Sequence, residues 1–316
     1  MLKLRAAVAG AYFPVPIDSI FSRMHANGSS SNHSHPAVSQ DQGRLVFARM
    51  NRYIGRLSKN LTPENVHLFR TNSRRVEALI EALAPETKNK KKALKLLAKL
   101  RKRAGKVRDI DVQIGLLKNL KVPDRQNHRT QLLELLDDEH DRHTRKLSKA
   151  ADASTLRELR KRLHREQDAI KFDGIDPLQL AVNALPSVGL SSLTEKTLHD
   201  FRIGAKHARY LAELAGENPA ATAFVDELKR AQNAAGEWHD ALKLKNRAEK
   251  RFGSAPESAL VSVLQNISRA RFRRASQALT SAVANLSKPG QLAKPPAQFQ
   301  HKAGFSEKTE QRSAVA

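Results

Sequence analysis

Two groups of basic residues in this 316-residue chain have the types and the spacing needed to bind phosphate. They are His67, Arg70 and Arg74 and, further along the chain, His199, Arg202, Lys206 and Arg209. Residues three, four and seven positions apart lie on one face of an α-helix, so each group would form a cationic stripe. An arginine guanidinium pairs with two phosphate oxygens at once, whereas a lysine ammonium acts as a point charge. The spacing therefore predicts two helices that each present a phosphate-binding face.

The two stripes belong to a longer sequence repeat. His67 and His199 each open the pattern H-x-F-R-x-x-x-[K/R]-[R/H], and they are 132 positions apart. A second shared phrase follows each copy, and it begins at Gly105 and at Gly236, which are 131 positions apart. Because both phrases keep their order and their spacing to within one residue, we interpret them as a duplicated helical unit.

The second phrase supplies further candidate residues. We expect Arg108 and His239 to lie near the stripes. Asp109 and Asp240 either hold the stripe arginines through paired hydrogen bonds or only balance charge locally, and the sequence leaves both readings open. A glycine inside a helix costs about 1 kcal/mol relative to alanine, so the glycine that opens each phrase favours a close approach of two helices. The predicted phosphate-binding set is completed by Arg75, Arg101 and His207, which lie beside these motifs.

A solvated helix face is the simpler interpretation of each stripe. Like charges at these spacings repel by a few tenths of a kcal/mol, however, and the rows contain no acid to relieve them. Each row also borders an apolar stripe that should be buried. The apolar stripes are Phe69, Val76, Leu79, Ile80 and Leu83 in the first copy and Leu198, Phe201, Ala208 and Leu211 in the second. Cations next to a buried stripe would lie in a groove between helices, which favours the binding interpretation.

The composition also favours a polyanionic partner. The chain has 56 Lys and Arg against 32 Asp and Glu, a formal net charge of +24. Nucleic acid, polyphosphate and anionic membranes would all be attracted through steering and counterion release. The chain has no cysteine, which excludes disulfides and thiolate metal sites. No apolar run approaches the length of a transmembrane helix, so we expect no membrane insertion.

The chain reads as helical almost throughout. We expect a flexible segment over 1–40, one helical domain over 41–286 with halves 41–150 and 151–286, and a disordered tail over 287–316. The helices are expected over about 41–59, 63–83, 87–119, 124–150, 153–172, 193–215, 219–251 and 256–286. The first residues only loosely resemble a signal peptide, so we expect no cleaved leader, and Met24 is an alternative start. The predicted fold class is all-α.

Sequence motifs of catalysis are missing from the chain. It has no glycine-rich phosphate loop, no H-E-x-x-H and no G-x-S-x-G, and no carboxylate cluster suggests a magnesium site. His140 and His143 could suggest a metal site, but their segment is more simply an exposed charged helix. We therefore expect no metal, no cofactor and no enzymatic activity. Phosphate transfer through His67 or His199 is the competing hypothesis.

The repeated motifs resemble those of the CHAD domain, the conserved histidine α-helical domain, and the resemblance covers about 41–286. It implies tandem-duplicated helical bundles related by a pseudo-twofold axis, with basic residues lining a central groove or cavity. It also implies binding of inorganic polyphosphate, often at polyphosphate granules, in a cytoplasmic protein. The chain departs from the family pattern at His207, where arginine is commoner. It departs from its own repeat at Glu77, which stands where the second copy has Arg209.

RNA binding is the alternative that the net charge leaves open. Single-stranded nucleic-acid binders usually offer aromatic side chains on which bases stack. Aromatic residues are 5% of this chain, and the stripes contain none apart from Tyr210 at one end. The sequence therefore favours a ligand that has phosphates and no bases, and it does not define an oligomeric state.

Overall fold

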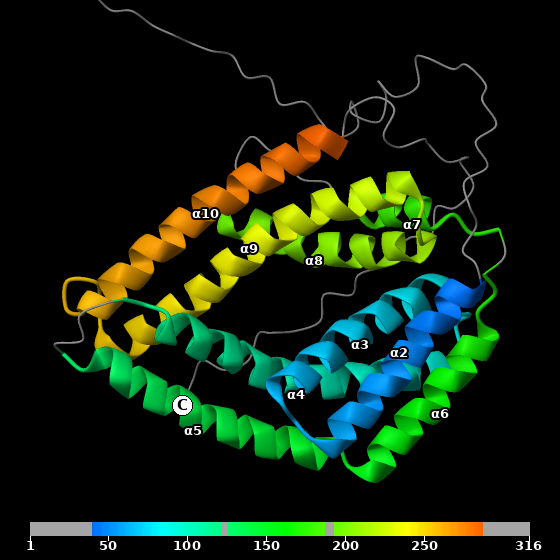
Figure 1. Cartoon of the computed structure of the whole chain (residues 1–316), viewed down its shortest axis with the longest axis horizontal. Helices are drawn as coiled ribbons and strands as arrows, with labels where there is room; N and C mark the ends of the chain where they lie inside the picture. Colours follow the sequence, from blue (N-terminus) through cyan, green and yellow to red (C-terminus); the bar gives the residue numbers. More distant parts are fainter. Residues whose placement is uncertain (1–39, 122–125, 173, 187–192, 287–316) are drawn as a thin grey trace, which may run out of the picture.

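The computed structural model describes residues 40–121, 126–172, 174–186 and 193–286, and within these residues the chain forms helices and no strand. The elements are α2 (Gln40–Lys59), α3 (Pro63–Leu83), α4 (Lys88–Lys118), α5 (His128–Ala150), α6 (Ala153–Ala169), α7 (Pro177–Ala184), α8 (Glu195–Ala212), the 3-10 turn η1 (Glu213–Ala215), α9 (Pro219–Phe252) and α10 (Ala259–Leu286). The all-α prediction is confirmed (Figure 1). The predicted flexible segment 1–40, except for its last residue, and the predicted tail 287–316 lie outside the described residues.

The eight predicted helices are present, with ends that differ by a few residues. At the start of α3 the Thr62 side chain accepts a hydrogen bond from the Asn65 amide at 3.3 Å, and a proline occupies the first turn, as the sequence predicts. Helix α7 lies between the helices predicted over 153–172 and 193–215, where the sequence predicted none. The Asp176 carboxylate accepts from the Leu178 amide at 2.9 Å, so Pro177 follows a capping residue and opens a helix.

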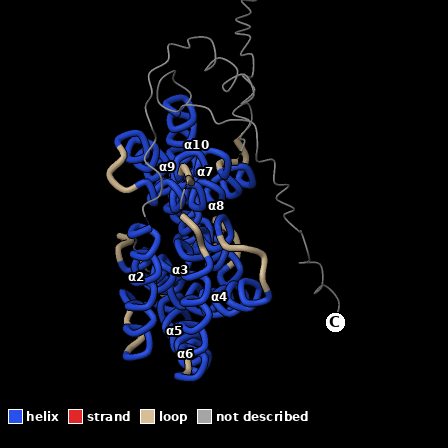
Figure 2. The backbone as a smooth tube through the Cα atoms, turned by 90° about the vertical axis from the view of Figure 1, so that its right-hand side faces the viewer, coloured by secondary structure: helices blue, strands red, loops and turns tan. Residues whose placement is uncertain are grey.

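The helices form two layers, with α7–α10 above α2–α6 in Figure 2. Across the layers α3 contacts α8, and the long helices α4 and α9 contact each other. Helix α6 packs against α2 and α4, although the predicted boundary at residue 150 assigned it to the second half. The division into halves stays a prediction.

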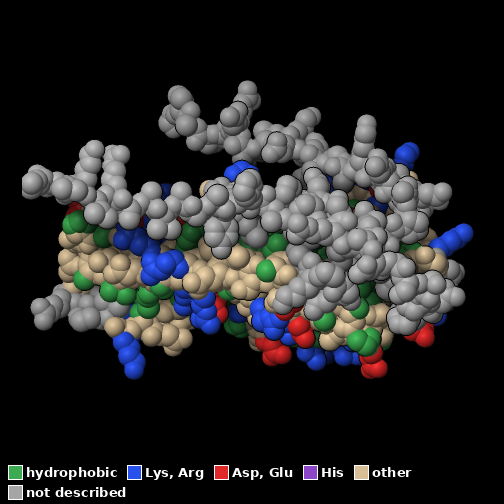
Figure 3. All heavy atoms as spheres, turned by 90° about the horizontal axis from the view of Figure 1, so that it is seen from above, with side chains coloured by type: hydrophobic (Ala, Val, Ile, Leu, Met, Phe, Trp, Pro, Cys, Tyr) green, Lys and Arg blue, Asp and Glu red, His purple; other side chains and the backbone are tan. Residues whose placement is uncertain are grey.

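Both predicted apolar stripes are buried in the main core, except for Leu83, which is half-buried against it. Phe69 on α3 and Phe201 on α8 are 0% and 1% exposed. A smaller core, which includes Ile110, Leu132 and Leu244, lies where α4, α5, α9 and α10 meet. On the face seen in Figure 3, Lys and Arg side chains (blue) are scattered along the described part of the molecule. The two cores fix the rotation of α3, α4, α8 and α9 and so determine where their basic faces point.

The lysines at the start of α4 differ in their exposure to solvent. Lys90 is 5% exposed, and its Nζ donates to the Ala84 carbonyl oxygen at 2.9 Å. The same Nζ lies 2.7 Å from Glu86 Oε1. Lys90 therefore satisfies a carbonyl at the end of α3, whereas Lys91 and Lys92 are exposed.

Candidate phosphate-binding site

A cavity of about 530 Å³, here called the motif cavity, lies between α3, α4, α8 and α9. Seven Lys and Arg side chains line it, together with three carboxylates. Its predicted lining residues are His67, Arg70, Arg74, Arg108, Asp109, Arg202, Lys206, Arg209, His239 and Asp240. The structure thus brings both stripes and both copies of the second phrase to one place.

The apolar stripes explain why the basic stripes face each other. Phe69 and Phe201 turn one side of α3 and of α8 into the core. Residues one and five positions after each phenylalanine then point to the neighbouring face, which lines the cavity. Those residues are Arg70, Arg74, Arg202 and Lys206.

The cations of the motif cavity repel one another in a partly buried setting. Burial and the nearby charges of Arg202, Arg74 and Arg70 lower the pKa of Lys206 from its ordinary 10.5 to about 7. Burial, followed by the charge of Arg70, also lowers the pKa of Arg74. Arg202 Nε is buried and has no hydrogen-bond partner among the residues that the structure describes. An incoming anion would relieve both the repulsion and the unsatisfied donor.

The histidines of the site are held neutral near pH 7. Burial and the charges of Arg202 and Lys243 lower the pKa of His239 to about 3. His199 does not line the cavity, but its ring centroid lies 5.2 Å from that of His239. Its pKa is also lowered, first by burial and then by Arg202. Neither ring is positively charged near pH 7, so the positive potential of the cavity comes from its arginines and lysines.

The two motif aspartates differ in their contacts. Asp109 Oδ1 lies 3.6 Å from Arg70 Nη2, and Asp109 Oδ2 accepts from Lys243 Nζ at 2.9 Å. Burial opposes ionisation of Asp109, but Lys243 and Arg70 outweigh it and hold the pKa below its usual range. Burial and then the charge of Asp109 raise the pKa of Asp240. Asp109 thus forms an ion pair with Arg70 and a hydrogen bond with Lys243, without the paired hydrogen bonds to an arginine that one hypothesis proposed, and the choice between the two hypotheses stays open.

Three predicted binding residues lie at helix contacts and do not line the motif cavity. Arg75 Nε donates to Glu213 Oε2 at 2.7 Å and links α3 to η1. Arg101 on α4 pairs with Glu77 on α3. His207 Nδ1 on α8 lies 3.9 Å from Glu81 Oε2 on α3. These contacts tie α3 to its neighbours, and a direct role of the three residues in binding stays a prediction.

The motif glycines do not mark a close helix approach, so that interpretation is wrong. A Cβ built on Gly236 would meet no atom within 4 Å, apart from its immediate neighbours. A Cβ on Gly105 would lie 3.4 Å from Arg70 Nε, an ordinary contact. Gly236 itself lines the motif cavity. The glycines leave space beside the cations and do not bring two backbones together.

The sequence reasoning missed several lining residues, of which Lys243 is the most important. It is four positions after His239, so the helical spacing could have revealed it. The first copy has Val112 at the equivalent place, so the repeat gave no signal. The other missed lining residues are Thr71, Val112, Tyr210, Gln232, Asn233, Gly236 and Glu237.

The charged segment of α5 is not simply solvated. His140 Nε2 lies 3.1 Å from Asp111 Oδ1, and the Asp111 side chain is only 10% exposed. This contact joins α5 to α4. Within the described residues, no three His, Asp, Glu or Cys side chains gather as metal ligands would. Nor does any described helix have the length and apolar character needed to cross a membrane.

Comparison with known proteins places this geometry in a family. The sequence model of the CHAD domain matches residues 43–249. A search of curated proteins gives no match. PptA from Streptomyces chartreusis has a similar fold, with a TM-score of 0.57, 15% identity, and coverage of 80% of this chain and 100% of that one. The CHAD domain from the plant Ricinus communis gives the same TM-score and identity and covers 83% of this chain and 96% of its own.

Proposed function

Since this chain belongs to the CHAD-domain family, we propose that it binds inorganic polyphosphate in the motif cavity. The observation that carries the proposal is the meeting of the two repeated stripes. Arg70 and Arg74 on α3 share one cavity with Arg202 and Lys206 on α8. The cations outnumber the lining acids by more than two to one, so the cavity suits a polyanion.

The chemistry of the lining residues matches a chain of phosphates. Each arginine can pair with two oxygens of a phosphate. The lowered pKa of Lys206 shows that its neighbouring cations repel it, and a bound anion would relieve this repulsion. Tyr210 is the one aromatic ring of Phe, Tyr or Trp that lines the cavity, and its residue is 7% exposed. A platform on which successive bases could stack is therefore lacking there, which favours polyphosphate over RNA.

We also propose that the fold is a duplicated bundle with an approximate twofold axis through the motif cavity. The contacts between α2, α3, α4 and α5 recur between α7, α8, α9 and α10 in the same order. Arg70 and Arg202 occupy equivalent positions in the two copies of the sequence repeat. Two related cationic walls would then face each other across the bound chain.

The binding is proposed to be non-enzymatic. Phosphoryl transfer and hydrolysis need groups that position a nucleophile and stabilise charge, commonly metal ions held by carboxylates. The three carboxylates on the cavity wall lie among cations, and Asp109 is engaged by two of them. Incubation with long-chain polyphosphate and magnesium or manganese, followed by gel analysis, should leave chain length unchanged. Protein-dependent shortening would favour the enzyme hypothesis.

The binding proposal is tested with a cavity variant and a charge-matched control. Arg202→Ala with Lys206→Ala removes two cations from the cavity wall. Lys99→Ala with Lys102→Ala removes two exposed lysines of α4 that line no described cavity. Each protein is titrated with polyphosphate and with single-stranded RNA of matched charge at two salt concentrations. We expect the cavity variant to lose clearly more affinity for polyphosphate than the control.

Two results would contradict the proposal. Equal losses from both variants would mean that net charge alone drives the interaction. Equal affinity of the unmodified protein for RNA and polyphosphate would remove the claimed selectivity and favour the nucleic-acid alternative. Circular dichroism melts of both variants check that the fold is retained.

A further inference from the structure

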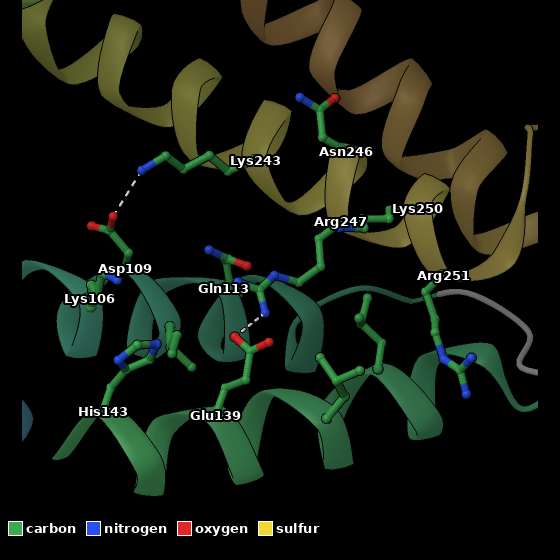
Figure 4. A pocket seen from close by; sticks show the side chains of 13 residues that line it. Lys106, Asp109, Gln113, Glu139, His143, Lys243, Asn246, Arg247, Lys250 and Arg251 are labelled. Carbon is green, nitrogen blue, oxygen red and sulfur yellow. Dashed lines mark hydrogen bonds and ion pairs between the residues drawn. The ribbon is translucent and has the colours of Figure 1, made fainter. Parts of the chain in front are cut away.

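A second cavity of about 730 Å³, here called the side cavity, lies between α4, α5 and α9 (Figure 4). Its floor includes Ile110 and Leu132 of the smaller core. Five Lys and Arg side chains and two carboxylates line it. The five cations are Lys106 on α4 and Lys243, Arg247, Lys250 and Arg251 on α9. Of the residues that the sequence motifs predicted for the site, Asp109 alone lines this cavity.

The side cavity adjoins the motif cavity. Asp109 and Lys243 line both of them. Lys243 Nζ donates to Asp109 Oδ2 at 2.9 Å, and Figure 4 shows this pair reaching from α9 to α4 at one end of the side cavity. A ligand that fills the motif cavity beside Lys243 therefore has a neighbouring space to enter.

One face of α9 carries a row of basic residues from the first cavity into the second. His239, Lys243, Arg247 and Lys250 are spaced by four, four and three residues, which places them on the same side of the helix. At 1.5 Å per residue the row is roughly 16 Å long. It runs parallel to the path that an extended polyanion would take along α9.

The cations of the side cavity are of two kinds. Arg247 Nη1 donates to Glu139 Oε2 at 2.5 Å, which fixes it between α9 and α5. Lys106, Lys250 and Arg251 are exposed, and none forms an ion pair with a described acid. In Figure 4 Arg251 projects from the end of α9 toward α5. Solvated surface charge would not explain why such cations come from two helices to the rim of one cavity.

We propose that the side cavity holds the continuation of a polyphosphate chain whose first part lies in the motif cavity, with Lys106, Lys250 and Arg251 as its contacts. This inference rests on the proposed function. A short phosphate chain fills the motif cavity alone, and a long chain passes Lys243 and reaches the side cavity. The side cavity therefore makes the protein prefer long chains over short ones.

The test compares short and long ligands on variants of the side cavity. Lys250→Gln with Arg251→Gln removes two contacts, and Lys106→Gln removes a contact from the opposite wall. Lys99→Gln with Lys102→Gln is the charge-matched control. Each protein is titrated with tripolyphosphate and with long-chain polyphosphate over a range of salt concentrations.

We expect the double variant to bind tripolyphosphate like the unmodified protein. Its affinity for the long chain should fall roughly tenfold, at about threefold for each exposed contact. The slope of log affinity against log salt should become shallower by about 1.5, at roughly 0.7 for each lost contact to a flexible strand. Lys106→Gln should lower the affinity for the long chain about threefold and make the salt slope shallower by roughly 0.7. The control should change neither the affinity nor the slope.

The outcomes separate this inference from the proposed function. If the unmodified protein binds neither ligand, the proposed function fails and the inference fails with it. If the unmodified protein binds both and the side-cavity variants bind the long chain unchanged, the inference alone is overturned. It is also overturned if those variants lose as much affinity for tripolyphosphate as for the long chain.

Discussion

We expect Lys206 to make the proposed polyphosphate binding depend on pH in a calculable way. In the free protein its pKa is lowered to about 7, so at pH 8 roughly one-tenth of the molecules carry a charge there. Phosphate oxygens next to the ammonium group would raise its pKa toward the ordinary 10.5, because an opposite charge favours the protonated form. Binding at pH 8 should therefore take up roughly 0.9 proton per protein molecule, falling to roughly 0.5 at pH 7 and roughly 0.1 at pH 6.

The sign of the affinity change follows from the same linkage. Because the bound state holds more protons than the free state, affinity must fall as pH rises above the free pKa of Lys206. A proton uptake of roughly 0.9 corresponds to a loss of roughly eightfold in affinity between pH 8 and pH 9. His239 should contribute little in this range, since its pKa is lowered to about 3.

Calorimetry measures this uptake directly. Titrations with polyphosphate at pH 8 in two buffers of different ionisation enthalpy give the number of protons taken up. The matched control is Lys206→Arg, which keeps the positive charge at every pH tested and should abolish the uptake while preserving binding. An uptake below roughly 0.2 in the unmodified protein, or the same uptake in the arginine variant, would refute the reasoning.

Four further predictions concern the free energy of unfolding, which is measured by the fluorescence of the buried Trp238 during denaturation. Lys90→Met should lower the free energy of unfolding by about 1–3 kcal/mol, because it leaves carbonyl oxygens at the end of α3 unsatisfied. Gly236→Ala should raise the free energy of unfolding by about 1 kcal/mol, because alanine favours the helix and the new methyl group meets no atom. Gly43→Ala should lower the free energy of unfolding by about 1–3 kcal/mol, because its methyl group would overlap the ring of the buried Phe172. Arg75→Ala should lower stability through the loss of its contact with η1 and leave polyphosphate affinity nearly unchanged; unchanged stability with weakened binding would place it in the binding site instead.

The helical periodicity was enough to predict the stripes and their orientation. Phe69 and Phe201 could be assigned to the core because each belongs to a run of apolar residues at helical spacing. Their neighbours Arg70 and Arg202 then had to point beside the core. These are local relations within one helix. A sequence pattern records them without knowledge of the tertiary contacts.

The missed features depend on residues that are far apart in the sequence or on a choice between two local signals. Glu213 pairs with Arg75 across 138 positions, and no pattern within α3 reveals it. Pro177 could end one helix or begin another, and the capping contact of Asp176 decides for the second. Lys90 stands in a run of charged residues that is typical of a solvated helix start, yet the turn after α3 brings a carbonyl oxygen to it.

The repeat motif divides adjacent cations between two tasks, because successive helical residues differ in direction by about 100°. Arg74 lines the motif cavity, whereas Arg75 pairs with Glu213 at the contact between α3 and η1. In the second copy Lys206 lines the cavity, and His207 faces a carboxylate of α3. Glu213 therefore neutralises Arg75 at the contact between α3 and η1, whereas the three carboxylates on the cavity wall are too few to cancel the repulsion among its seven Lys and Arg side chains. That retained repulsion is the source of selectivity in our proposal, since a flexible chain of phosphates can enter between the two layers and neutralise it.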